Sequence, residues 1–111
     1  MAYDEELADR IRDLLAGERG VTEKKMFGGL AFLVDGKMAV TASGKGGLLA
    51  RVDPAQTDRF ARGAHVDPFV MRNRPMEGWL RVDAAGVRTQ RQLRTWVDRG
   101  VAYVRTLPPK R

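Results

Sequence analysis

Reactive side chains are scarce in this sequence of 111 residues. It has no cysteine, a single histidine, His65, and a single serine, Ser43. The lack of cysteine excludes disulfide bonds, thiolate nucleophiles, iron–sulfur clusters and cysteine-based zinc sites. Nucleophilic catalysis also needs a nucleophile placed beside a base, and few residues here could supply either. We therefore expect a protein that is not an enzyme and that has no cofactor and no metal site.

Long hydrophobic runs are missing as well. The longest uninterrupted aliphatic and aromatic run is Leu30–Val34, whereas a membrane-spanning helix needs about 20 apolar residues. The N-terminal stretch MAYDEELADRI is acidic and amphipathic, unlike a signal peptide, which begins with basic residues and continues with an apolar segment. We expect a soluble, cytoplasmic protein that does not bind membranes.

The composition is that of a globular domain, with 43% hydrophobic and 31% charged residues. Its length suits one domain of roughly 100–200 residues, so residues 1–111 are assigned to a single domain with a short Pro-Pro-Lys-Arg tail at 108–111. The net charge of +6 is uneven, because residues 59–111 carry twelve Lys/Arg against four Asp/Glu. Such a basic half indicates an anionic partner. Codon bias explains it equally well, since 15 of the 20 basic residues are arginine.

Hydrophobic periodicity predicts a helix followed by strands in the first half of the chain. The helix runs from about Glu5 to Ala16, with Asp4 as its N-cap and Gly17 closing it. A strand is expected at Val21–Phe27, where Gly28-Gly29 interrupts it. Further strands are expected at 30–34 and 37–42, on either side of a two-residue hairpin turn at Asp35-Gly36, and at 48–52.

A short helix and two short strands are expected next. Asp53 caps the helix, Pro54 takes its first position, Gln56 completes a capping box, and the helix ends near Gly63. The strands are expected at 69–71 and 79–82, joined through a turn at 72–75.

The last helix is the clearest element. Thr89 and Gln92 form a capping box at its start, and Pro108-Pro109 ends it. Its apolar stripe consists of Leu93, Trp96, Val97, Gly100, Val101, Val104 and Leu107. The element order α-β-β-β-(β)-α-β-β-α predicts a two-layer α+β fold. In this fold an antiparallel sheet of about five to six strands carries three helices, mainly on one face.

Catalytic and phosphate-binding alternatives have weaker support. A nucleophile–base pair could come only from Ser43 and His65, with Asp67 as a third member, but the segment SGKGG lacks the flanks of a nucleophile elbow. Read as a phosphate loop, SGKGG precedes an apparent strand instead of a helix. The acids that could form a catalytic pair lie where acids commonly cap or turn, namely Asp53, Asp67, Glu77 and Asp83. A hydrolase or a small-anion-binding domain is therefore the weakest alternative.

A nucleic-acid-binding accessory protein is the main alternative. Its candidate contacts are the arginines on and before the last helix and in the expected turn, namely Arg72, Arg74, Arg88, Arg91, Arg94 and Arg105. Arginine suits bidentate contacts to phosphate. However, no helix-turn-helix, RNA-recognition or zinc-finger pattern is present, and a solvated helix face explains these arginines equally well.

Three segments together resemble the TfoX/Sxy N-terminal domain family of competence-gene regulators. They are EKKMFGGLAFLVDGKMA at 23–39, RPMEGWLRVD at 74–83 and LRTWVDRGVAYVRTLPPK at 93–110. The likeness runs from Tyr3 to Lys110, and its most specific parts are the Lys-Met-Phe-Gly-Gly and Met-x-Gly-Trp steps. It implies a two-layer α+β domain without known catalysis. It also implies positive regulation of transcription in bacteria through contact with a transcription-regulator protein, alongside a cyclic-AMP receptor protein.

Full-length regulators of this type carry a second, C-terminal helical domain. This sequence ends at Pro108–Arg111, so we expect a stand-alone version of the first domain. Its candidate surface for a partner or a small anion is formed by Lys24, Lys25, Met26, Phe27, Gly28, Gly29 and Trp79. In the alternative reading, Met26 or Phe27 enters the core and the glycines form a bulge or allow a close backbone approach. A homodimer through the sheet or a strand edge is also expected.

Overall fold

The computed structural model describes residues 3–26 and 28–108. Within them, the helices are α1 (Glu5–Leu14), α2 (Thr57–Ala61) and α3 (Gln90–Arg105), with two 3₁₀ helices, η1 (Pro54–Gln56) and η2 (Ala84–Val87). The strands are β1 (Val21–Met26), β2 (Gly29–Val34), β3 (Lys37–Ala42), β4 (Leu48–Arg51), β5 (Val66–Met71) and β6 (Arg74–Val82).

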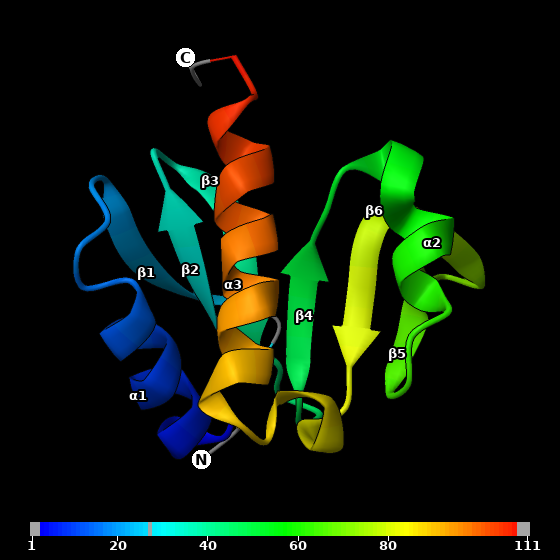
Figure 1. The fold of residues 1–111 in the computed structure, drawn as a ribbon, viewed down its shortest axis with the longest axis horizontal. Coiled ribbons are helices and arrows are strands. Elements are labelled where there is room, and N and C mark those ends of the chain that lie inside the picture. Colours follow the sequence, from blue (N-terminus) through cyan, green and yellow to red (C-terminus); the bar gives the residue numbers. More distant parts are fainter. Residues whose placement is uncertain (1–2, 27, 109–111) are drawn as a thin grey trace.

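The strands form one antiparallel sheet of six strands in the order β1-β2-β3-β4-β6-β5. The chain reaches the far edge of the sheet through α2 and returns through the β5–β6 hairpin, so that β6 pairs with β4. Helices α1 and α3 lie across one face of the sheet, and α2 stands beside β5 and β6 (Figure 1). This confirms the predicted two-layer α+β fold.

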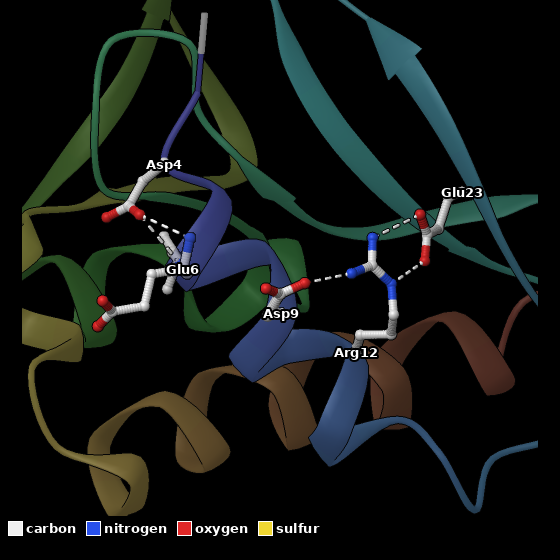
Figure 2. A network of polar contacts seen from close by, with 6 residues as sticks. Asp4, Glu6, Asp9, Arg12 and Glu23 are labelled. Carbon is white, nitrogen blue, oxygen red and sulfur yellow. Dashed lines mark hydrogen bonds and ion pairs between the residues drawn. The ribbon is translucent and has the colours of Figure 1, made fainter. Parts of the chain in front are cut away.

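The first helix is fixed at its start by its N-cap. Asp4 Oδ1 accepts hydrogen bonds from the backbone N–H groups of Glu6 at 2.9 Å and Leu7 at 3.2 Å (Figure 2), as predicted. The helix ends at Leu14, two residues before the predicted end, and the backbone N–H of Leu15 donates to Ile11 at 3.0 Å. The expected closure at Gly17 is therefore wrong, since Leu15 occupies the C-cap.

An arginine on α1 ties the helix to the edge strand β1. Arg12 donates two hydrogen bonds to Glu23, at 2.6 and 2.9 Å, and one to Asp9 at 2.5 Å (Figure 2). The hydrogen bonds from Arg12 lower the pKa of Glu23. Because side chains alternate along a strand, this pair also places Glu23 on the helical side of the sheet.

The core lies between the sheet and the helices. Its largest fully buried side chains come from α1, α3 and four strands, β2, β3, β4 and β6, and include Ile11, Phe32, Leu48, Leu80 and Leu93. The predicted capping box of α3 is present, with the Gln92 N–H donating to Thr89 Oγ1 at 3.1 Å and the Thr89 N–H donating to Gln92 Oε1 at 2.9 Å. The predicted apolar stripe of α3 packs on the sheet, since Leu93, Trp96, Val97, Gly100, Val101 and Val104 are buried.

The second capping box and the last two strands differ from the prediction. Asp53 Oδ1 accepts from the Ala55 N–H at 2.9 Å, and among the described residues the Gln56 side chain returns no hydrogen bond. Strands β5 and β6 extend beyond the predicted 69–71 and 79–82, and the turn between them contains only Arg72 and Asn73, with φ of 53° and 66°. Such positive φ angles are typical of a two-residue hairpin turn.

Helix α2 lies on the same side of the sheet as α3. The rings of Phe60 and Trp96 meet edge to face, with centroids 6.1 Å apart. The helices thus occupy one side of the sheet, and none of the described elements covers the opposite side, which is called the open face below. No helix within the described residues is long and apolar enough to cross a membrane.

Candidate functional site

The open face of the sheet carries a groove of about 300 Å³. All six strands and the β3–β4 loop contribute to it. Its lining residues are Met26, Gly29, Met38, Thr41, Ser43, Gly44, Lys45, Leu49, Phe69, Met71, Met76, Trp79 and Arg81. The groove is therefore a property of the whole sheet and not of one loop.

Strand alternation explains why apolar side chains face outward here. On β4, Leu48 and Ala50 are buried under the helices, whereas Leu49 between them is half-buried and lines the groove. Leu49 pairs with Arg81 of β6, and Arg51 pairs with Trp79. The sheet thus carries large apolar side chains on both faces, although helices cover only one of them.

Methionine is the most frequent residue type among those that line the groove. Four of the chain's five methionines line it: Met26, Met38, Met71 and Met76. The side chains of Met71 and Met76 are 40% and 37% exposed, and the Thr41 hydroxyl donates to the Met38 sulfur at 2.9 Å. Methionine side chains adapt their shape to different partners, so the groove can accommodate apolar groups of different shape.

The charged groups that line the groove are basic. Lys45 and Arg81 are among its lining residues, and no acid is, as far as the described residues form it. Arg51 does not line the groove; its guanidinium carbon lies 5.1 Å from the centroid of the Trp79 ring and 5.5 Å from that of Tyr103 on α3. None of these three cations takes part in an ion pair between described residues. The nearest acid by sheet register is the exposed Asp67, opposite Arg81.

The residues of the predicted partner surface, 24–29 and Trp79, do not all lie together in the structure. Met26, Gly29 and Trp79 come together in the groove. Lys24 and Lys25 are exposed on β1 and do not line it. By alternation Lys24 shares the face of Met26, whereas Lys25 shares the helical side with Glu23.

The other residues predicted for that surface are Phe27 and the two glycines that follow it. Gly28 is exposed with φ of +77°, and Phe27 lies outside the described residues. A Cβ on Gly29 would stand 2.4 Å from the Ala42 carbonyl oxygen, which confirms the predicted close backbone approach. Of the alternative that Met26 or Phe27 enters the core, only the part on Met26 can be compared, and Met26 lines the open groove instead.

The arginines predicted to contact nucleic acid are spread over the molecule. Arg105 pairs with Glu18 at 2.9 Å and with Asp35 at 3.4 Å, and Arg94 pairs with Asp98 at 3.9 Å. Arg88 and Arg91 lie at the other end of α3 from Arg105, about 20 Å away at 1.5 Å per residue. Arg72 and Arg74 belong to the β5–β6 hairpin. The arginines therefore do not form one continuous basic surface.

The candidate catalytic residues also lie apart. Ser43 lines the groove, where its Oγ accepts from the Lys45 N–H at 3.1 Å. His65 lines a different cavity on the helical side of the sheet. Among the described residues, no three His, Cys, Asp or Glu side chains are grouped in a way that could hold a metal ion.

The sequence analysis did not identify most of the residues that line the groove. Met38, Leu49, Phe69, Met71 and Met76 are ordinary apolar residues of strands, and their composition does not tell which face they occupy. The available signal was that β2, β3 and β4 have apolar residues at consecutive positions, although an antiparallel sheet with one solvated face should alternate with polar ones.

Comparison with known proteins gives one match. The family model described as the TfoX N-terminal domain matches residues 13–103. No curated protein and no solved structure matches significantly.

Proposed function

This chain belongs to the TfoX N-terminal domain family, and we propose that it acts by binding a partner protein and not by catalysis. The partner contributes an apolar segment, flanked by acidic residues, that lies in the groove on the open face of the sheet. One observation carries the proposal: four methionines and Trp79 form an uncovered apolar surface whose lining charges are all basic.

The shape and composition of the groove suit a protein segment. Aromatic and methionine side chains are enriched where proteins bind each other, and a few such anchors supply most of the binding energy. Trp79 is half-buried and has Arg51 beside its ring, so it offers a large contact area that loses little freedom on binding. The surrounding methionines can adjust to side chains of different shape.

Charge favours an acidic partner over a second copy of this chain. In a symmetric dimer both copies use the same surface, so a face-to-face dimer would place two sets of Lys45 and Arg81 within one interface. Like charges placed against each other in an interface oppose association. Acidic residues flanking an apolar segment would complement the same cations. The homodimer expected from the sequence would therefore form elsewhere, for example through a strand edge.

The resemblance to competence regulators supports a proposal on the biological role. We propose that the bound protein belongs to the transcription apparatus and that the domain regulates transcription, in keeping with the competence regulators that the sequence resembles. The dispersed arginines give no specific observation in favour of direct nucleic-acid binding. Nucleic-acid capture is accordingly an outcome that would count against this function.

Two neighbouring residues offer a matched test. Met71 lines the groove, whereas Val70, the preceding residue of β5, is 54% exposed and does not. A photoreactive amino acid is placed at one or the other position, the producing cells are irradiated, and mass spectrometry identifies the cross-linked segment. We expect position 71, but not position 70, to capture a protein through an apolar segment with acidic flanks. Adducts with nucleic acid, with this chain alone, or equally from both positions would contradict the proposal.

A synthetic peptide of the captured segment then tests the role of charge. Its affinity is measured by calorimetry for the wild type, for Lys45→Glu and Arg81→Glu, and for Arg62→Glu as a control, because Arg62 is exposed at the end of α2, outside the groove. Removing a charge-assisted contact costs about 1.5–3 kcal/mol, or roughly tenfold or more in affinity. Equal affinity for all four proteins would refute the acidic nature of the partner.

A further inference from the structure

A second cavity lies on the helical side of the sheet, between α2, α3 and the loop that leads into β5. Its volume is about 410 Å³. Five polar side chains line it, namely Arg59, His65, Gln92, Thr95 and Arg99. No acidic side chain lines it within the described part of the chain. The cavity is thus bordered by two cations and several hydrogen-bonding groups, without a counter-ion from the protein.

Arg99 is held in place by aromatic rings. Its guanidinium carbon lies 4.1 Å from the centroid of Phe60 and 4.6 Å from that of Trp96. Among the described residues it forms no ion pair. Burial lowers the pKa of Arg99, and the charge of Arg59 lowers it further. Arg99 is therefore a half-buried cation whose position is set by two aromatic rings, with Arg59 lining the same cavity.

Arg59 approaches the same ring from α2. Its guanidinium carbon lies 5.8 Å from the Phe60 centroid, so both arginines stand beside one aromatic side chain. Two such cations repel each other in the absence of a ligand. An anion bound in the cavity that both arginines line would add two attractive contacts that offset this repulsion.

His65 is positioned by its backbone. It has a left-handed φ of 66°, and its carbonyl oxygen accepts a hydrogen bond from the Asp83 N–H at 2.8 Å. Gly86 makes room for it, since a Cβ there would lie 3.0 Å from the His65 Cβ and 2.7 Å from Val82 Cγ1. These constraints keep the imidazole-bearing residue at the edge of the cavity.

Gln92 and Thr95 complete the polar lining from α3. Gln92 uses its Oε1 to accept from Thr89, which leaves its Nε2 hydrogens without an acceptor among the described residues. The Thr95 hydroxyl donates to the Arg91 carbonyl at 3.1 Å. Donors thus come from two helices and a loop.

The acids nearest in sequence do not neutralise these cations. Asp58, Asp83 and Asp98 adjoin cavity-bordering segments but do not line the cavity. Asp98 pairs with Arg94 at 3.9 Å. The positive charge of Arg59 and Arg99 is therefore available to a ligand.

From this arrangement we infer a binding site for a phosphoryl group, either as inorganic phosphate or as a small phosphate monoester. A phosphoryl dianion accepts hydrogen bonds in several directions, and arginine matches its geometry with two parallel N–H groups. Arg59 and Arg99 supply charge, and Gln92 and His65 supply further contacts. The site lies across the sheet from the groove and does not depend on the proposed partner.

The single histidine gives a direct readout. Because His65 is the only histidine of the chain, its imidazole signals in an NMR spectrum need no assignment by mutation. The purified protein is titrated at constant ionic strength and pH with inorganic phosphate, with adenosine monophosphate and with chloride. We expect saturable shifts of the His65 signals with one or both phosphoryl probes, and the tighter of the two identifies the source. Shifts that do not saturate, or that chloride reproduces, would overturn the site.

Matched variants locate the contacts. Arg59→Gln and Arg99→Gln should each weaken phosphoryl binding by at least about tenfold, since each removes a charge-assisted hydrogen bond. Arg94→Gln is the control, because Arg94 lies on the same helix and is exposed outside the cavity. Arg99→Gln could lose stability with its contacts to Phe60 and Trp96. In that case Arg59→Gln tests the site by itself, because Arg59 is exposed and its replacement should not disturb the fold. Equal weakening by Arg94→Gln would overturn the site.

Discussion

Replacing Gly100 with alanine tests how closely α3 lies on the sheet. Gly100 is buried in the middle of the helix, on the side that faces β3. A Cβ at this position would lie 2.6 Å from the carbonyl oxygen of Ala39 and 3.2 Å from its carbonyl carbon. Both atoms belong to the backbone of a strand that is paired on either side, so the clash can be relieved only if the helix moves away.

Two effects of opposite sign decide the result. Alanine in a helix interior is more favourable than glycine by roughly 0.5–1 kcal/mol, whereas overfilling a packed core costs about 1–3 kcal/mol. Because the contact is with backbone and not with the end of a flexible side chain, we expect the second effect to exceed the first. The expected net loss for Gly100→Ala is about 1–2 kcal/mol in the free energy of unfolding.

Urea unfolding followed by circular dichroism measures this loss as a lower midpoint at an unchanged slope. The control is Ala102→Gly in the same helix, where Ala102 is exposed and only helix propensity should act. The control should lose about 0.5–1 kcal/mol. If Gly100→Ala is instead more stable than the wild type, α3 does not approach β3 as closely as the structure indicates.

Two further changes test the polar contacts of the fold. Thr57 is buried, and its hydroxyl donates to the Pro54 carbonyl at 3.0 Å while accepting from the Gly78 N–H at 2.8 Å. Thr57→Val leaves that buried N–H without an acceptor and should lower the free energy of unfolding by about 1–3 kcal/mol. Thr57→Ser keeps the hydroxyl and should unfold nearly as the wild type does. Equal urea midpoints for both variants would contradict this role. The lowered pKa of Glu23 means that its contribution to stability is present above its usual pKa of 4.5 and is lost as the pH falls through the lower folded-state value. Glu23→Gln should therefore flatten the acid side of the stability curve, by less than about 1 kcal/mol because the pair is partly solvated; an unchanged pH dependence in urea titrations would exclude this contribution.

The sequence predicted the starts of α1 and α3 correctly, because helix caps depend on neighbouring residues. The caps at Asp4 and Thr89 depend on hydrogen bonds within three residues, so the sequence contains all the necessary information. Strands β5 and β6 are longer than predicted, and the structure extends them through Pro68 and Pro75. Pro68 is tolerated because β5 is an edge strand, where a missing N–H need not interrupt the sheet.

The candidate sites depend on contacts that sequence patterns do not encode. Trp79 joins Met26 in the groove only because β6 pairs with β4 and the first four strands form a meander. The cavity on the helical side likewise takes its lining residues from α2, α3 and the loop before β5, which lie far apart in the sequence. The motif residues Met26, Gly29 and Trp79 could be named in advance, but the face on which they meet could not.

The affinity of the captured partner segment for two variants of β5 tests the function most directly. Met71→Asp and Val70→Asp introduce the same charge at neighbouring exposed positions, and only the first lies in the groove. We expect Met71→Asp to weaken binding by about tenfold or more, with Val70→Asp close to the wild type and both variants equally stable. Binding that is unchanged in Met71→Asp, or weakened equally in both, would show that the open face of the sheet is not the site of contact.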